Sequence, residues 1–249
     1  MKVNNKPEIV EDVSSSGCLR SRAALRVAHG FFDSQGAEIV ERPKVNNMQN
    51  DSKQTESAGA VSSTRLLGHG IPAMVFDVES IGLHGDGYAV GYVVIQDGKE
   101  VESGMFACPA SKANGADSDR LWVYENIPQI APDSADLLAV RENFWCRWME
   151  WKAKGALLAA DCAWPVEARF LAACVDASPD ERRFSGPYPL VEISSVMMAV
   201  GQDPMKTHAR LESEMPVHNP VADARQSARL LLEAIEVTKR EWPNEKGQR

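Results

Sequence analysis

The chain has 249 residues, of which 44% are hydrophobic and 25% are charged, proportions typical of a globular protein with one sizeable buried core. Its formal net charge of −8 argues against a protein that holds nucleic acid through a broadly basic surface, because that mode needs many Lys and Arg side chains at phosphates. Bound cations could offset such a surplus of acidic side chains. The sequence contains no apolar run of the roughly 18 residues that cross a bilayer and no signal-peptide pattern, so we expect a cytoplasmic protein without membrane contact.

The first part of the chain differs in composition from the rest. Residues 1–70 mix Asn, Ser, Gln, Lys and Glu and are predicted to form a largely flexible N-terminal extension. Within it, residues 21–32 place Ala, Leu and Val between Arg residues in a pattern that could form a short helix. The main domain is therefore expected to occupy residues 71–238, with a C-terminal tail over residues 239–249.

Three strands are predicted at the start of the main domain. Residues 71–77 are apolar and bounded by Gly-containing segments, which is typical of a buried strand. Residues 88–96 and 100–107 form two further strands, and Asp97-Gly98 between them is a hairpin-turn sequence. Three strands in succession indicate an antiparallel meander.

The next segments alternate between helix and strand. After an irregular stretch that ends at Pro132, residues 134–154 carry Leu, Val, Phe and Trp at helical spacing, and Gly155 is expected to end that helix. Residues 156–160 form a short apolar strand, and Pro165 suits the first turn of the helix that follows.

The last elements are a segment of ambiguous type and a long helix. Residues 190–200 are apolar and fit either a strand or a helix. Asn219-Pro220 has the residue types of a helix cap and a first helical position, and it opens a helix that runs through Leu230 and Ile235. A meander followed by alternating helices and strands predicts an α/β fold with a mixed sheet.

A pair of acidic residues stands at the end of the first strand. In Asp77-Val-Glu79 the two carboxylates are two positions apart and therefore project from the same side of the strand. Two carboxylates on one side of a buried strand repel each other unless a positive charge is present. Mg²⁺ and Mn²⁺ prefer such oxygen ligands, although a pair at a solvated strand end explains the same pattern.

A histidine and an aspartate mark the head of the last helix. His218 lies in a Pro-bounded loop, and Asp223 falls about one turn into the helix, where the helix dipole favours a carboxylate. This arrangement can place a mobile histidine side chain next to a site that is lined in part by Asp223. Taken alone, such a pair is more often a cap or a salt-bridged loop.

The combination of these two motifs resembles a known family. Asp77-Val-Glu-Ser-Ile-Gly-Leu83, together with His218 and Asp223 at the head of a terminal helix, looks like the first and third motifs of the DEDDh 3′→5′ exonucleases. This DnaQ-like superfamily includes the proofreading subunit of bacterial replicative polymerase, ribonuclease T and oligoribonuclease. The resemblance covers residues 73–232 and implies a ribonuclease H-like fold, in which helices flank a mixed five-stranded sheet.

The middle motif departs from the family pattern. The family usually places a single Asp after a strand, at the start of a helix with apolar residues three and four positions later. Here Asp161 stands at the strand end, whereas Glu167 has the expected spacing to Phe170 and Leu171. We favour Asp161, because a shorter carboxylate on a rigid strand end is easier to preorganise. Glu167 is the alternative, and it could instead stabilise the start of its own helix.

The resemblance implies an activity, a cofactor and a catalytic set. The expected reaction is hydrolysis of single-stranded DNA or RNA from 3′ ends to nucleoside 5′-monophosphates, with two Mg²⁺ or Mn²⁺ ions that activate water and stabilise the leaving oxygen. Histidine suits the role of proton acceptor, because its unperturbed pKa is about 6.5. The implied set consists of one general base and the metal-binding carboxylates: His218, Asp77, Glu79, Asp161 and Asp223, with Glu167 as the alternative to Asp161.

Substrate contacts are expected near the first and second motifs and on scattered aromatic and basic residues. Ser80 and Ile81 adjoin the first motif, and Trp164 adjoins the second. For the scattered residues, burial in the core or a solvated surface position is the commoner role. The candidates for base stacking are Trp122, Tyr124 and Tyr188, and the candidates for phosphate contacts are Arg169, Arg182, Arg183, Arg210 and Arg225.

Substrate type, oligomeric state and an alternative function stay open at this point. The choice between RNA and DNA depends on backbone positions in the cleft that would contact a 2′-hydroxyl. Some members of the family are dimers, so a homodimer is compatible with the resemblance. The alternative function is a non-catalytic nucleic-acid or protein interaction module on the same fold, whose mark would be the loss of a motif carboxylate or of the histidine.

Overall fold

The computed structural model describes residues 66–241. The predicted helix over residues 21–32, the rest of the predicted extension up to residue 65 and the tail after residue 241 lie outside this range. The described part begins with two short strands, β1 (Leu66–Leu67) and β2 (Gly70–Ile71), which pair in parallel with each other.

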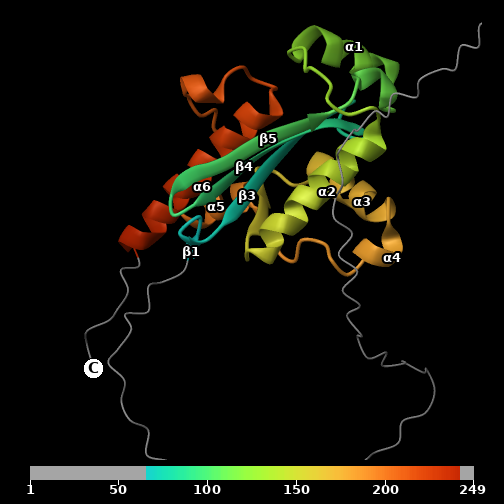
Figure 1. The fold of residues 1–249 in the computed structure, drawn as a ribbon. Coiled ribbons are helices and arrows are strands. Elements are labelled where there is room, and N and C mark those ends of the chain that lie inside the picture. Colours follow the sequence, from blue (N-terminus) through green and yellow to red (C-terminus); the bar gives the residue numbers. More distant parts are fainter. Residues whose placement is uncertain (1–65, 242–249) are drawn as a thin grey trace, which may run out of the picture. The chain divides into compact units, whose positions relative to one another are not determined.

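A mixed sheet of five strands organises the domain (Figure 1). The strands are β3 (Ala73–Ser80), β4 (Gly87–Gln96), β5 (Lys99–Ala107), β6 (Leu157–Ala160) and β7 (Leu190–Glu192). Their order in the sheet is β5-β4-β3-β6-β7; the first three form an antiparallel meander, and β6 and β7 run parallel to β3. The predicted α/β fold with a mixed five-stranded sheet flanked by helices is thereby confirmed.

Helices cover both faces of this sheet. They are α1 (Asp117–Asn126), α2 (Leu137–Ala153), α3 (Val166–Asp176), α4 (Pro179–Arg182), α5 (Ile193–Ala199) and α6 (Pro220–Glu241), with short 3₁₀ helices over Ala110–Lys112 and Glu212–Glu214. The helices α2 and α3 pack on one face and α5 and α6 on the other (Figure 1). None of the helices within the described range is long and apolar enough to span a membrane.

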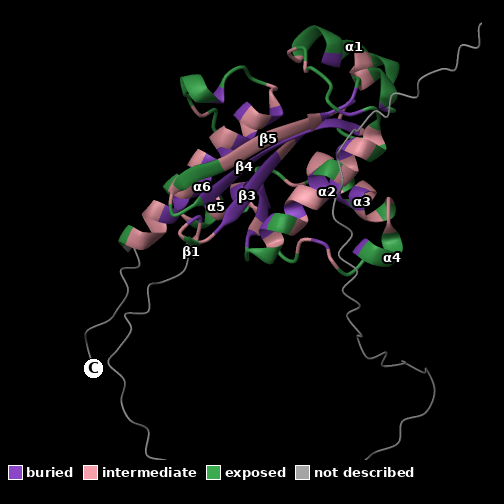
Figure 2. Cartoon of the chain, in the orientation of Figure 1, coloured by how far each residue is buried: buried purple, intermediate pink, exposed green. Residues whose placement is uncertain are grey.

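Each face of the sheet has its own apolar core (Figure 2). On the α2–α3 face, the rings of Phe76 and Phe144 lie 5.2 Å apart between centroids, and Trp148 packs beside them out of contact with water. On the α6 face, Val75 and Leu231 are buried together. Because successive side chains of a strand point to opposite faces, β3 contributes to both cores.

Local sequence signals place the turns and helix ends. Asp97 and Gly98 have positive φ angles of 51° and 74°, which confirms the predicted hairpin turn. The side chain of Asp136 accepts a hydrogen bond from the backbone N–H of Ala139 at 2.9 Å and so caps α2. Gly155, with a φ of 84°, follows the end of that helix as predicted.

Two predictions of local structure differ from the fold. The stretch before Pro132, predicted to be irregular, contains α1, in which Val123 is the one buried residue. A helix with so little buried surface has no apolar stripe of helical period, so the pattern could not reveal it. Residues 190–200, which fitted either a strand or a helix, contain both, because β7 leads directly into α5.

Candidate active site

Asp77 and Glu79 project from the α6 side of β3 near the end of that strand. Their neighbours Phe76 and Val78 point into the core beneath α2 and α3, as the alternation of a strand requires. Glu79 is only 7% exposed. The acidic pair that the sequence suggested therefore lies on one side of the sheet, with little contact with water.

The first turn of α6 comes close to this pair because the opposite strand offers a glycine. Gly91 on β4 pairs with Asp77, and a Cβ at position 91 would lie 2.3 Å from the backbone of Pro220 and Val221. A side chain there would push the helix away from the sheet, because real Cβ atoms do not approach backbone closer than 3.0 Å. Gly91 thus sets the distance between α6 and the acidic pair.

The loop before α6 fixes the orientation of Asp223. Asn219 caps the helix, since its Oδ1 accepts hydrogen bonds from the backbone N–H groups of Val221 (3.2 Å) and Ala222 (3.1 Å), as predicted. His218 has a positive φ of 60°, an uncommon conformation for a residue other than glycine. In that conformation its backbone N–H donates a hydrogen bond to Asp223 Oδ2 at 3.1 Å.

Three side chains from the two ends of the domain converge at this point. Glu79, His218 and Asp223 each offer one potential metal-ligand atom, and these atoms all lie within 4.8 Å of one another. His218 Nδ1 is 4.0 Å from Glu79 Oε1, and the His218 ring meets Trp122 edge to face at a centroid distance of 5.5 Å. Carboxylate oxygens are the ligands that Mg²⁺ and Mn²⁺ prefer, so the donor set fits the expected cations.

The carboxylates of Asp77, Glu79, Glu167 and Asp223, which we call the acidic cluster, repel one another. Burial raises the pKa of Glu79 to about 8, and the nearby Asp223 and Glu167 carboxylates add to the rise. Burial, followed by the charge of Glu79, raises the pKa of Asp77 well above its ordinary value. Both shifts identify carboxyl groups that are costly to ionise without a neighbouring positive charge. A bound divalent cation would supply that charge.

The two candidates for the middle motif occupy different surroundings. Glu167, in the first turn of α3, raises the pKa of both Glu79 and Asp77, and burial raises its own pKa to about 7. Asp161 is exposed and affects the pKa of Asp77 least among the named neighbours. Its Oδ1 accepts a hydrogen bond from Ser194 Oγ at 3.1 Å. The charge of Glu167 thus acts on the acidic pair more strongly than that of Asp161, the candidate favoured on sequence grounds.

Asp223 differs from the other clustered carboxylates because it has an arginine partner. Arg210 belongs to the α5–α6 segment, residues 200–219, and places Nη1 2.5 Å from Asp223 Oδ1. Within the described residues, Glu79 pairs with His218 alone, and no ion pair involves Asp77 or Glu167. One fixed positive charge is therefore part of the site.

The predicted substrate-binding residues have different settings. Ile81 is fully buried, and its backbone N–H donates a hydrogen bond to the Asp86 carbonyl at 3.1 Å, so the residue belongs to the core in the described conformation. Ser80 Oγ donates a hydrogen bond to the Gly82 carbonyl at 2.7 Å and supports the turn after β3. Trp164 is 69% exposed just before α3. The other aromatic candidates are also exposed rather than in the core: Trp122, Tyr124 and Tyr188.

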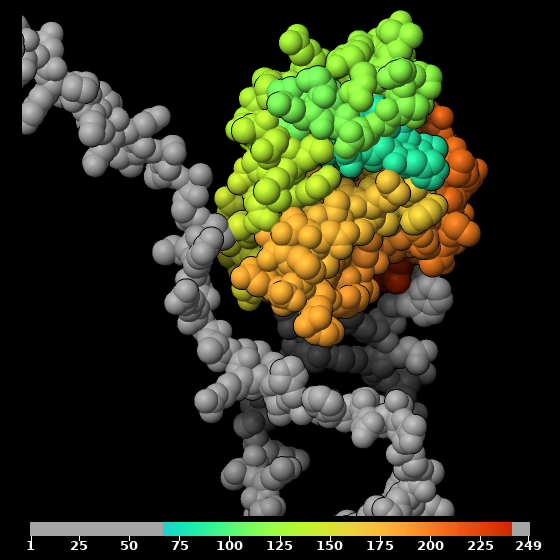
Figure 3. Space-filling view, turned by 90° about the vertical axis from the view of Figure 1, so that its right-hand side faces the viewer, coloured from blue at the N-terminus to red at the C-terminus, as the bar shows by residue number. Residues whose placement is uncertain are grey.

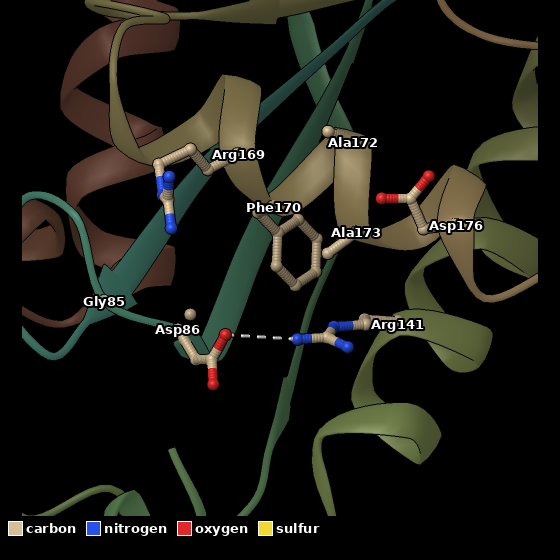
Figure 4. A pocket seen from close by; sticks show the side chains of 9 residues that line it. Gly85, Asp86, Arg141, Arg169, Phe170, Ala172, Ala173 and Asp176 are labelled. Atoms are coloured by element: carbon tan, nitrogen blue, oxygen red, sulfur yellow. Dashed lines mark ion pairs between the residues drawn. The ribbon is translucent and has the colours of Figure 1, made fainter. Parts of the chain in front are cut away.

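A pocket of about 230 Å³ lies between α2, α3 and the turn before β4 (Figure 4). Arg141 from α2 and Arg169 from α3 border it, and Phe170 separates them in Figure 4, where Arg141 pairs with Asp86 at 3.5 Å. None of the clustered carboxylates lines this pocket. Its place on the flank of α3 makes Arg169 a candidate contact for a bound strand, but not a part of the reaction centre.

Two of the other arginines predicted to contact phosphates instead form a hydrogen bond or an ion pair within the domain. Arg182 is 6% exposed and donates a hydrogen bond to the Cys174 carbonyl at 2.8 Å. Arg225 pairs with Glu100 at 3.0 Å. Arg183, in contrast, is exposed. The buried and paired arginines stabilise the fold in the described conformation.

The elements of the site meet on one face of the domain. Figure 3 shows the stretch that follows β3 (teal) at the surface, bordered by the region before α2 (green), by α3 (gold) and by the α5–α6 segment (orange). These four parts of the chain are widely separated in sequence. The surface seen in this view is therefore assembled only when the sheet and both helical layers are in place.

Sequence reasoning missed two features of the site. Gly91 was not singled out, although a glycine inside a strand pattern is a known signal of close backbone approach. Arg210 was named as a candidate phosphate contact, but its ion pair with Asp223 spans a loop whose path the sequence does not reveal. No local pattern could have identified that pair.

The solved structures that resemble this chain in fold include two exonucleases. No protein-family model matches the chain, and no curated protein matches it. The zinc-ion-bound form of the E. coli ExoI–ssDNA complex aligns with a TM-score of 0.47 and 14% identity over 70% of this chain and 41% of that chain. Exonuclease I from Methylocaldum szegediense, described as moderately thermophilic, aligns with a TM-score of 0.45 and 13% identity over 70% of this chain and 41% of that chain. The chain thus spans about two fifths of the length of these two proteins.

Proposed function

We propose that the protein is a metal-dependent nuclease that removes nucleotides from the 3′ ends of single-stranded nucleic acid and releases nucleoside 5′-monophosphates. The observation that carries the proposal is the convergence of Glu79, His218 and Asp223 within 4.8 Å. The direction of cleavage and the nature of the product rest on the motif resemblance to the DEDDh exonucleases alone.

The carboxylates that would hold the cations are Asp77, Glu79 and Asp223. The first two are acidic groups with raised pKa values and no lysine or arginine partner among the described residues, a situation that favours binding of a cation. Bound Mg²⁺ or Mn²⁺ would activate water and stabilise charge on the leaving oxygen. Glu167 is proposed as the fourth carboxylate because of its effect on the acidic pair, and Asp161 is the alternative.

His218 is proposed as the general base. Its Nδ1 faces Glu79 Oε1 at 4.0 Å, so this nitrogen can accept a proton from a water molecule held between the two side chains. The backbone N–H of the same residue orients Asp223, and Trp122 lies against its ring. His218 would thus act as the general base through its side chain and help to position the metal ligand Asp223 through its backbone N–H.

Digestion of end-labelled oligonucleotides tests the proposal. Single-stranded RNA and DNA, labelled at either end, are incubated with the protein and Mg²⁺, Mn²⁺ or a chelator. With a divalent cation, we expect a 3′ label to appear at once in mononucleotides and a 5′-labelled strand to shorten stepwise. With the chelator, we expect neither product. A comparison of the RNA and DNA strands identifies the preferred substrate.

Two variants make this experiment specific to the cluster. Asp77→Asn removes a central carboxylate and is expected to abolish the release of mononucleotides. Glu102→Gln changes a half-buried carboxylate on β5 outside the cluster and is expected to keep the activity. Undiminished release by Asp77→Asn would overturn the proposal. So would binding of the strands without any cleavage by the wild-type protein, the result expected of a non-catalytic interaction module.

A further inference from the structure

The ion pair between Arg210 and Asp223 brings a fixed cation into the cluster of acidic side chains. Arg210 Nη1 lies 2.5 Å from Asp223 Oδ1, and the two side chains are 20% and 14% exposed. The other oxygen of the carboxylate, Oδ2, accepts the backbone N–H of His218. Both oxygens of a proposed metal ligand are therefore already engaged.

The position of Arg210 does not depend on Asp223 alone. Its Nη1 also donates a hydrogen bond to the Glu214 carbonyl at 3.0 Å. The Glu214 side chain is itself held by Arg229 of α6, whose Nε lies 2.6 Å from Glu214 Oε1. The backbone N–H of Leu211 adds a hydrogen bond to Glu214 Oε2 at 2.9 Å. The α5–α6 segment thus keeps the guanidinium beside Asp223.

A guanidinium in this position has two electrostatic effects. It neutralises one carboxylate of a crowded acidic group, which favours the folded protein when no divalent cation is present. It also repels a divalent cation that approaches the same carboxylate, because two positive charges then share one negative partner at short range. A phosphate group of a nucleic-acid strand at the same place would offset the repulsion.

We propose that Arg210 is a resident counter-ion of the site, which neutralises Asp223 in the metal-free protein and weakens divalent-cation binding until a phosphate group of the substrate joins the site. The inference rests on the proposed nuclease function and adds a regulating residue to it. Arg210 acts through Asp223 and is a positioning residue, not a catalytic one. Binding of the cation and of the substrate phosphate is thereby linked, each favouring the other.

Calorimetric titration of Mn²⁺ into the protein without nucleic acid tests the charge effect directly. Arg210→Gln keeps a hydrogen-bond donor without the charge, and Arg210→Met removes both. We expect both variants to bind Mn²⁺ about tenfold more tightly than the wild type, the size expected for removal of a screened unit charge a few ångströms from a divalent ion. Unchanged or weaker binding by the folded variants would overturn the proposal.

Two further variants control for net charge and for folding. Arg225→Met also removes one positive charge and one ion pair from the α6 region, but its partner is Glu100 rather than a clustered carboxylate, so we expect its Mn²⁺ affinity to stay within about twofold of the wild type. Arg210→Lys retains the charge and is expected to keep the wild-type affinity. If neither neutral variant folds, a folded Arg210→Lys protein that binds Mn²⁺ about tenfold more tightly would contradict the charge argument, and wild-type affinity would support it.

The linkage is measured with adenosine 5′-monophosphate as the phosphate probe. We expect saturating probe to increase the Mn²⁺ affinity of the wild type by a larger factor than that of Arg210→Gln. An equal increase in both proteins would contradict the linkage. A wild-type protein that degrades strands with Mn²⁺ while Arg210→Gln shows no gain in affinity would refute this inference alone; a wild-type protein that neither binds Mn²⁺ nor cleaves would refute the proposed function.

Discussion

Glu79 and Glu214 are both buried glutamates, 7% and 2% exposed, but their electrostatic surroundings are opposite. Arg229 places its Nε 2.6 Å from Glu214 Oε1 and lowers the pKa of that carboxyl group below its ordinary value. Burial raises the pKa of Glu79 to about 8, and Asp223 and Glu167 add to the rise. Two similarly buried carboxyl groups therefore have pKa values that are shifted in opposite directions by their charged neighbours.

The difference between the two regions lies in whether the fold supplies the counter-charge. Around Glu214 it does, and the resulting ion pair attaches the α5–α6 segment to α6. Around Glu79 it does not, so three clustered carboxyl groups have raised pKa values. Perturbed pKa values of this kind are common at functional sites, because a bound cation, a substrate or a proton can provide the compensating charge that the folded protein lacks there.

Substitution of Glu79 should have the largest effect. We expect it to reduce the nuclease activity rather than the stability. We expect Glu79→Gln to reduce the release of mononucleotides by about a hundredfold or more, because a cation ligand is lost. The same change should not lower the stability of the metal-free protein, because it replaces a carboxyl group that is costly to ionise at this position with a neutral amide of similar size. Digestion assays and urea unfolding with a chelator measure the two effects. A variant that is fully active but unstable would show that Glu79 is a structural residue.

Substitution of Glu214 should show the reverse pattern. We expect Glu214→Gln to lower the free energy of unfolding by about 2 kcal/mol, because Arg229 then loses its buried carboxylate partner and retains, among the described residues, only the half-exposed Glu233 as an ion-pair partner. Urea unfolding measures this loss. An unchanged stability would contradict the structural role of the ion pair and weaken the contrast with Glu79.

Gly91→Ala tests how the fold brings the two ends of the site together. The added Cβ would overlap with the backbone of Pro220 and Val221, so we expect the start of α6 to shift and the free energy of unfolding to fall by about 1–2 kcal/mol. Mn²⁺ binding should weaken as well, because Asp223 moves with the helix. A variant with wild-type Mn²⁺ affinity would contradict the assigned role of Gly91.

A gradual pH dependence of the free energy of unfolding is also expected. The raised pKa values of Glu79 (about 8) and Glu167 (about 7) mean that the folded protein retains protons that the unfolded chain releases above about 4.5. The stability of the metal-free protein should therefore decline progressively as the pH rises from about 5 to about 8. The decline should be smaller in Glu79→Gln. Urea unfolding that shows rising stability over this range would contradict the raised pKa values.

The fold could be predicted where the signals are local. Apolar runs, the Asp97-Gly98 turn and the Asn219 cap placed the strands of the meander and the start of α6 within a few residues. The helix α1 was missed because it buries only Val123. The middle motif could not be decided from sequence, because Asp161 and Glu167 both follow β6 and their distance to the acidic pair depends on how α3 packs against β3.

The site was predicted in its composition more than in its geometry. The motif residues Asp77, Glu79, His218 and Asp223 were named from sequence, and three of these four are in the group that could hold a metal ion. The contacts that adjust the site depend on tertiary structure. Arg210 meets Asp223 only because the α5–α6 segment is attached to α6 by Arg229, and such a path has no local sequence signature.

Titration of Mn²⁺ into the wild-type protein and into Asp223→Asn, followed by calorimetry without nucleic acid, tests the central claim most directly. The missing counter-charge near Glu79 predicts saturable binding by the wild type and a loss of that binding in the variant. An absence of binding by the wild type, or equal binding by both proteins, would contradict the assignment of this cluster as a cation site.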